Sequence, residues 1–170
     1  GEGAEMLIFD VRDNLGGLTE SLQGTLDYVL GDKDVVTAYY KDKTEVVIST
    51  TEANQIKMPI AVIVNGNTAS CSELFAFALR DEANAQIVGT KTYGKGVMQR
   101  THKLSGGAAV KVTVATLQTK NSGNYNGVGI TPNFEVALPT EVELALLNEE
   151  QQLEADTQLI KAIEVVSTIQ

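Results

Sequence analysis

Ser70 and Lys95 are the residues of this sequence whose types and settings favour covalent chemistry. Ser70 follows an apolar run and precedes a helical pattern, so it is expected where a buried strand gives way to a helix. The free N–H groups and the positive dipole end of a helix N-terminus suit the binding of an oxyanion. A serine hydroxyl also needs a base, and a lysine can serve when burial lowers its pKa. Lys95, between Gly94 and Gly96, lies in a loop where close backbone packing could exclude water from the amine.

Each of these residues also has an ordinary structural interpretation. Ser70 or Ser72 could simply cap the helix, as serine often does. Lys95 could be a solvated loop lysine. His102 is an alternative base, but it lies in an expected strand of alternating polarity and no positioned carboxylate accompanies it. These alternatives stay open when the residues are considered one at a time.

The segment around Lys95 also nearly matches a phosphate-binding loop. Gly89, Gly94 and Lys95 satisfy the first part of that motif, but Gly96 replaces the Ser or Thr that would bind magnesium. The residues that follow read as a strand and not as the required helix. Nucleotide binding is therefore disfavoured.

The composition excludes several classes of protein. The 170 residues include 13 Lys and Arg against 22 Asp and Glu, a net charge of −9 that disfavours binding to nucleic acid. No apolar run approaches the ~18 residues of a membrane span. Cys71 is the only cysteine and His102 the only histidine, so neither an internal disulfide nor a typical zinc site is expected.

The periodicity of apolar residues predicts an α/β domain whose sheet is covered on at least one face. Thr140 and Glu143 match a capping box ahead of a C-terminal helical segment that is broken near Asn148. The expected strands lie at 6–11, 35–40, 45–50, 60–64, 86–88, 98–104 and 108–117, and the other expected helices at 18–29 and 72–80.

Five segments, in order along nearly the whole chain, resemble the catalytic core of the C-terminal processing peptidases, or tail-specific proteases. The first is a strand ending in Asp-x-Arg-x-Asn-x-Gly-Gly, and the second is similar to a Ser-Ala-Ser-Ala-Ser-Glu stretch of that family. The segments are 7–17, 67–73, 89–99, 127–132 and 156–162. Each segment alone is a weak signal, whereas the ordered set is specific.

The resemblance implies a serine/lysine dyad with Ser70 as nucleophile and Lys95 as base, and with Gln99 orienting the lysine. It implies an oxyanion hole built from the backbone N–H of Cys71 and that of Gly16 or Gly17, a choice the sequence leaves open. It also implies a crotonase/ClpP-like α/β fold with a mixed sheet, packed helices and a C-terminal helical segment, and no metal or cofactor. Supporting roles near the site are expected for Ser72, Glu73 and Thr92.

The function implied is that of a serine endopeptidase that cleaves near the C-termini of protein substrates through an acyl-enzyme. The alternative is a non-catalytic module of the same fold that binds peptides or apolar ligands. Residues 1–170 read as one protease core domain, and the family's PDZ domain and first core strands have no counterpart, so a fragment is expected. The resemblance places the protein in the periplasm or cell envelope, and an exposed sheet edge would allow a homodimer.

Overall fold

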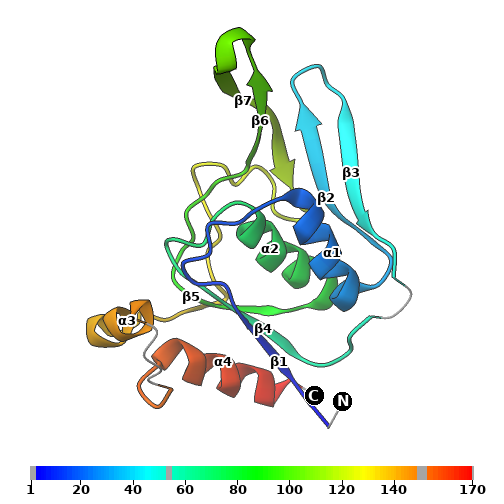
Figure 1. The fold of residues 1–170 in the computed structure, drawn as a ribbon. Helices are drawn as coiled ribbons and strands as arrows, with labels where there is room; N and C mark the ends of the chain where they lie inside the picture. Colours follow the sequence, from blue (N-terminus) through cyan, green and yellow to red (C-terminus); the bar gives the residue numbers. More distant parts are fainter. Residues whose placement is uncertain (1–2, 53–54, 149–152, 170) are drawn as a thin grey trace.

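Two four-stranded sheets and the helices packed on them make up the fold (Figure 1). The computed structural model describes residues 3–52, 55–148 and 153–169. The elements confirm a mixed α/β architecture with parallel and antiparallel strands. Among the described residues, no helix is both long and apolar enough to cross a membrane.

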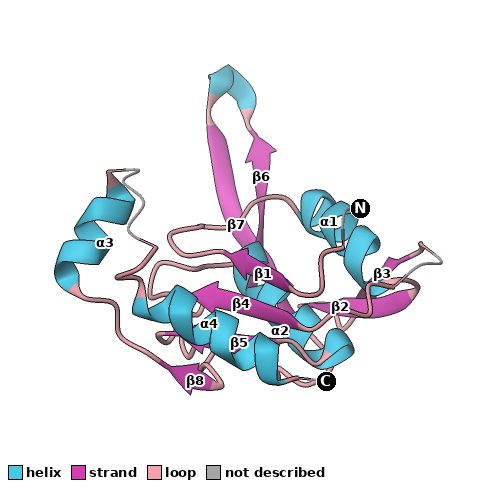
Figure 2. Cartoon of the chain, turned by 90° about the horizontal axis from the view of Figure 1, so that it is seen from below, coloured by secondary structure: helices cyan, strands magenta, loops and turns pink. Residues whose placement is uncertain are grey.

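The first sheet is parallel and forms the centre of the molecule. Its strand order is β1 (Leu7–Asp10), β4 (Ile60–Val64), β5 (Gln86–Gly89) and β8 (Phe134–Glu135). β4 reads Ile-Ala-Val-Ile-Val and is buried along its whole length, as expected for a central strand that is covered on both faces. α1 (Thr19–Leu30) and α2 (Cys71–Ala83) lie on one face of the fold, and α4 (Thr157–Thr168) covers the other (Figure 2).

The second sheet is antiparallel, with strand order β3 (Glu45–Thr50), β2 (Lys33–Tyr40), β7 (Ala109–Gln118) and β6 (Val97–Lys103). The expected strands at 35–40 and 45–50 pair as one hairpin, and those at 98–104 and 108–117 pair as another. A short 3₁₀ turn, Ser105–Gly107, joins β6 to β7. β7 pairs with β2 only through residues 115–118, and beyond this point the β6–β7 hairpin extends outward (Figure 1).

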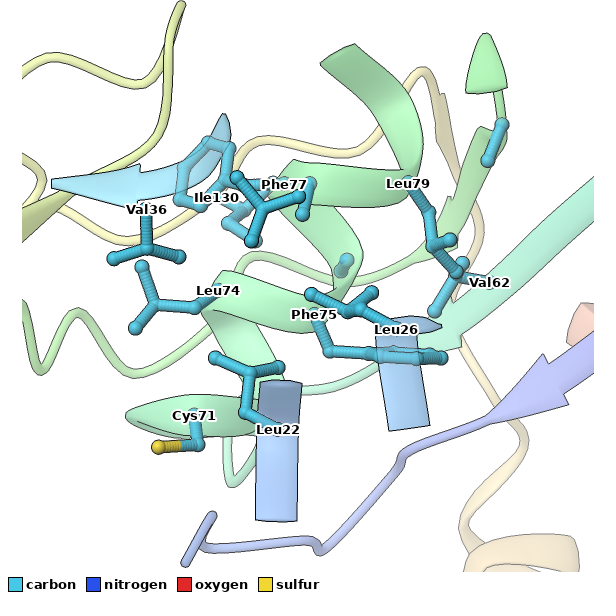
Figure 3. Packing of buried hydrophobic residues seen from close by; sticks show 14 of the residues in the cluster. Leu22, Leu26, Val36, Val62, Cys71, Leu74, Phe75, Phe77, Leu79 and Ile130 are labelled. Atoms are coloured by element: carbon cyan, nitrogen blue, oxygen red, sulfur yellow. The ribbon is translucent and has the colours of Figure 1, made fainter. Parts of the chain in front are cut away.

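α2 is the most buried helix, and the main core forms around it. Its side chains are buried without interruption from Cys71 to Leu79. Leu22 and Leu26 of α1 pack on one side of α2, and Val62 of β4 lies on another (Figure 3). Because α2 is enclosed on several sides, the backbone of its first turn has little freedom to move.

The C-terminal part differs from the expected pattern in one respect. α3 (Thr140–Leu147) begins at Thr140 itself, so the predicted capping box with Thr140 as cap is wrong. Pro139 stands at the cap position and makes no side-chain cap hydrogen bond. The expected break near Asn148 is confirmed, since α3 ends there and the next helix begins at Thr157.

A buried ion pair ties α4 to the end of β1. The Arg12 guanidinium donates to Asp156 Oδ2 at 2.8 Å, and the side chains of both residues are buried. Burial acts to lower the pKa of Arg12, but hydrogen bonds and charges from Asp10 and Asp156 raise it above its usual value. Asp156 also caps α4 by accepting from the N–H groups of Gln158 and Leu159.

Replacing Asp156 with alanine should therefore remove both the partner of Arg12 and the cap of α4. We expect Asp156→Ala to lower the free energy of unfolding by about 3 kcal/mol, as measured by urea denaturation. Glu164→Gln is the control, because it breaks only the exposed Lys161–Glu164 pair, and its effect should stay below about 0.5 kcal/mol. Equal losses in the two variants would contradict the structural role given to the buried pair.

Candidate active site

Ser70 lies at a sharp turn immediately before α2. Its backbone has φ 59° and ψ −122°, a conformation that non-glycine residues rarely adopt. Its N–H donates to Glu73 Oε2 at 2.9 Å, and its carbonyl accepts from the N–H of Leu74. The strained turn is thus fixed by the first turn of a buried helix, and it holds Ser70 half-buried at the helix N-terminus.

The carboxylate of Glu73, which is fully buried, is the centre of the site. Oε2 accepts the N–H of Ser70 at 2.9 Å and the N–H of Lys95 at 2.8 Å. Oε1 accepts the hydroxyl of Thr92 at 2.6 Å and the N–H of Gly94 at 2.7 Å. One carboxylate thus joins the backbone of Ser70 to the backbone of Lys95.

The Lys95 loop is held from its other side by residues 125–130. Gly127 donates its N–H to the carbonyl of Gly94 at 2.8 Å, and Gly96 donates to Asn126 Oδ1 at 3.2 Å. Gly94 has φ +88°, and a Cβ at this position would lie 2.7 Å from a backbone nitrogen of the opposing loop. The loop therefore needs glycine at this position to pack so closely.

Lys95 is not part of a phosphate-binding loop. The chain continues from Gly96 into strand β6 and not into a helix. The N–H groups of Gly94 and Lys95 are directed to the Glu73 carboxylate. A protein carboxylate occupies the position at which such a loop would bind phosphate.

Cys71, the first residue of α2, carries a buried thiol. Burial raises the pKa of this thiol above its usual value, while the Ser70 hydroxyl and the charge of Lys95 act on it in the opposite direction. The raised pKa keeps the thiol protonated at neutral pH, which disfavours Cys71 as a nucleophile.

Gly16 and Gly17 form a turn beside Ser70, here called the glycine turn, and their two N–H groups have different surroundings. The N–H of Gly16 donates to Asn14 Oδ1 at 3.0 Å. In the part of the chain that the structure describes, no acceptor is recorded for the N–H of Gly17 or for that of Cys71. The thiol of Cys71 lies 3.2 Å from the carbonyl of Gly17 and ties the two segments together.

An open pocket of about 350 Å³ begins at this turn. Its walls are mainly apolar and come from β1, α1 and α2. Gly17 and Cys71 line one side of it, and the larger apolar residues that line it are Phe9, Val11, Leu18, Leu22 and Phe75.

The remaining predicted residues are placed as follows. Thr92 is buried and also accepts the N–H of Ile130 at 2.7 Å, and Ser72 is buried in the first turn of α2. Gln99 is exposed on β6, and no hydrogen bond between its side chain and Lys95 is recorded among the described residues. His102 is exposed farther along the same strand.

Two further residues, neither of them predicted from the sequence, support the site. Tyr125 is 2 % exposed, packs on Phe77 with ring centroids 5.0 Å apart, and directs its hydroxyl to the carbonyl of Lys95. Asn14 shapes the glycine turn through its side chain and accepts the N–H of Ala69 at its carbonyl. An aromatic residue inside an otherwise polar loop was the available signal for Tyr125.

Gly16 and Gly17 offer a matched test of how the glycine turn packs against the residues around Ser70. Gly16 has φ +86°, and a Cβ would lie 2.6 Å from the carbonyl oxygen of Ala69, whereas a Cβ at Gly17 would meet no atom within 4 Å. We expect Gly16→Ala to lower the free energy of unfolding by about 2 kcal/mol. Gly17→Ala should change it by less than about 0.5 kcal/mol. Thermal or urea unfolding measures both values, and the reverse order would contradict the observed packing of the turn.

Known proteins resemble this chain over most of its length. A curated relative, carboxyl-terminal-processing peptidase 1 of Arabidopsis thaliana, described as chloroplastic, is 38 % identical over 135 residues, which is 78 % of this chain and 28 % of that protein. The carboxy-terminal processing protease CtpA of Bacillus subtilis is 30 % identical over 151 residues, or 88 % of this chain and 32 % of the relative. The chain thus spans roughly a third of the length of the curated relatives it matches.

The fold matches a solved structure of the same kind. A photosystem II D1 C-terminal processing protease superposes with a TM-score of 0.74 and 33 % sequence identity, covering 84 % of this chain and 38 % of that one. The family model described as peptidase family S41 matches residues 1–136, which include Ser70, Glu73, Lys95 and the glycine turn. The chain therefore belongs to peptidase family S41.

Proposed function

We propose that this chain carries the catalytic site of a C-terminal processing serine peptidase that uses Ser70 and Lys95. The observation that supports this most strongly is the single oxygen of Glu73 that accepts the N–H groups of both residues. The family match supports the same assignment. Because the chain covers about a third of its curated relatives, the activity of the whole protein is part of the proposal.

The proposed mechanism follows from the chemistry of a serine hydroxyl with a lysine base. Lys95, in its neutral form, takes the proton of the Ser70 hydroxyl as Oγ attacks the peptide carbonyl carbon. The C–N bond then breaks, and Lys95 returns the proton to the leaving amine. Water hydrolyses the resulting ester and restores the serine. Gln99 is proposed to orient the amine, while Ser72, Glu73 and Thr92 support the site.

The oxyanion is proposed to bind at the N–H groups of Cys71 and Gly17. Gly16 is the less suitable donor because its N–H already bonds to Asn14 Oδ1. The N–H of Cys71 also lies at the N-terminus of α2, where the helix dipole favours negative charge. The adjoining apolar pocket is proposed to hold a substrate side chain next to the scissile bond.

The substrates are proposed to be proteins cleaved near their C-termini, because the relatives carry names of this type. We also propose a crotonase/ClpP-like fold and a location outside the cytoplasm, in the periplasm or cell envelope. A neighbouring PDZ domain and a homodimer belong to the same proposal. The chloroplast location named for the Arabidopsis relative supports an organelle or envelope setting.

A fluorophosphonate label tests the nucleophile without knowledge of the substrate. We expect mass spectrometry to find one adduct on Ser70, and none in Ser70→Ala or, at short times, in Lys95→Met. Cleavage of unfolded β-casein should fall by at least about 10³-fold in both variants. Cys71→Ala is the control and should keep most of the activity, because the oxyanion donor at position 71 is the backbone. A chain that is folded but never labelled would instead favour the non-catalytic binding module.

Glu73→Gln tests the positioning of the dyad. An amide of the same shape must direct its NH₂ group toward N–H or O–H donors, so some of the four hydrogen bonds break. We expect kcat to fall by about 100-fold, as for a displacement of catalytic groups, with little change in KM. Glu45→Gln, at an exposed glutamate of β3, serves as control and should leave both constants unchanged. A variant with unaltered kcat would contradict the positioning role.

A further inference from the structure

The outer part of the β6–β7 hairpin, residues 99–113, forms an arm that stands away from the body of the molecule (Figures 1 and 2). Every residue of this arm is exposed. A two-stranded ribbon with water on both faces is marginally stable alone. A partner bound along the arm would bury part of this exposed surface.

The charges on the arm oppose those on the rest of the chain. No Asp or Glu occurs in residues 83–134, although the whole chain has a net charge of −9. The arm itself carries Arg100, Lys103 and Lys111. No ion pair to any of these three is recorded in the described ranges. The arm is thus a locally basic surface on an acidic protein.

Apolar side chains alternate with these charges along the arm. Val110 and Val112 are 41 % and 39 % exposed. The partner of Val112 across the ribbon is Arg100, whose guanidinium donates to the Tyr40 hydroxyl at 3.2 Å. Val110 pairs with His102. Arg100 shares this face with the two valines, whereas Lys103 and Lys111 lie on the opposite face of the ribbon. An extended chain paired with the edge of β6 also directs alternate side chains to the two faces, so apolar side chains beside the valines and carboxylates beside the lysines would complement the arm.

The arm also leads directly to the proposed site. β6 begins at Val97, two positions after Lys95, and lies at the edge of its sheet. A polypeptide lying along β6 would therefore continue past Lys95 and Ser70. The alternative ligand, an anionic membrane, fits less well, because Leu104 is the only large apolar side chain at the turn of the arm.

We infer that the arm binds an acidic, extended segment of the protein substrate and guides the substrate to Ser70. This inference rests on the proposed peptidase function for the identity of the ligand. The binding itself can be measured without catalysis.

The test uses the Ser70→Ala chain and a fluorescein-labelled peptide of twelve alternating Glu and Val residues. Fluorescence anisotropy at low salt should give a Kd that rises about tenfold when Arg100→Gln, Lys103→Gln and Lys111→Gln are combined. Added salt should weaken binding to the parent and bring the two Kd values together. Lys41→Gln with Lys43→Gln, on the turn of the neighbouring β2–β3 hairpin, is the control and should leave the Kd unchanged. Circular dichroism should show that all variants fold, as expected for exposed residues.

Several results would overturn the inference. One is an unchanged Kd in the combined arm variant, and another is equal binding of a peptide in which Gln replaces every Glu. A third is loss of binding to vesicles of phosphatidylserine and phosphatidylcholine in the arm variant while its peptide binding stays intact. The peptidase function is judged separately, by labelling of Ser70 in the wild-type chain, so failure of either proposal is recognised independently.

Discussion

Four hydrogen bonds to the carboxylate of Glu73 hold together the two chain segments on which the site is built. One segment is the strained turn at Ser70, and the other is the loop from Thr92 to Lys95. A buried carboxylate loses its hydration, which costs several kcal/mol. Hydrogen bonds to a charged acceptor contribute about 1.5–3 kcal/mol each, so four of them offset much of that cost. The carboxylate stays buried because the site surrounds it with donors.

The rest of the fold keeps these donors in place. α2 provides Glu73 and is enclosed by α1, β4 and the second sheet, so its first turn has little freedom. Residues 125–130 form hydrogen bonds with the Lys95 loop on the side away from Glu73. The Arg12–Asp156 pair secures the end of β1, from which the glycine turn begins. Each half of the site thus depends on contacts between segments far apart in the sequence.

Local patterns predicted the elements well and their assembly poorly. Burial requires apolar side chains, and their spacing along the chain can be read from the sequence. The apolar run from Ile60 to Val64 therefore predicted a buried strand, and the spacing of Leu22 and Leu26 predicted a helix. The division into two sheets depends on long-range pairing, which no local pattern records. β8 has two residues, too few to show a period. The capping box failed because the helix begins at Thr140 itself, with Pro139 at the cap position, one residue earlier than the motif implies.

The site was likewise predictable where it depends on local motifs and not where it depends on contacts between distant segments. The resemblance pointed to Ser70, Lys95 and the glycine turn as the proposed site, since those segments keep a recognisable order of residue types. It assigned Glu73 only a supporting role, because a motif does not show which donors a carboxylate will receive. Tyr125 lay in a loop read as merely polar, and its burial follows from packing on Phe77. The choice between Gly16 and Gly17 depends on the Asn14 side chain, whose direction the sequence does not record.

Amide hydrogen exchange, followed by NMR in the wild-type chain and in Glu73→Gln, tests the central role of this carboxylate most directly. The N–H groups of Ser70, Gly94 and Lys95 lie outside regular helices and strands, yet all three donate to Glu73. Our account predicts that these three amides are protected in the wild type and lose protection together in the variant. The amides in the middle of α2 should stay protected in both. Rapid exchange of the three amides in the wild-type chain would contradict the account.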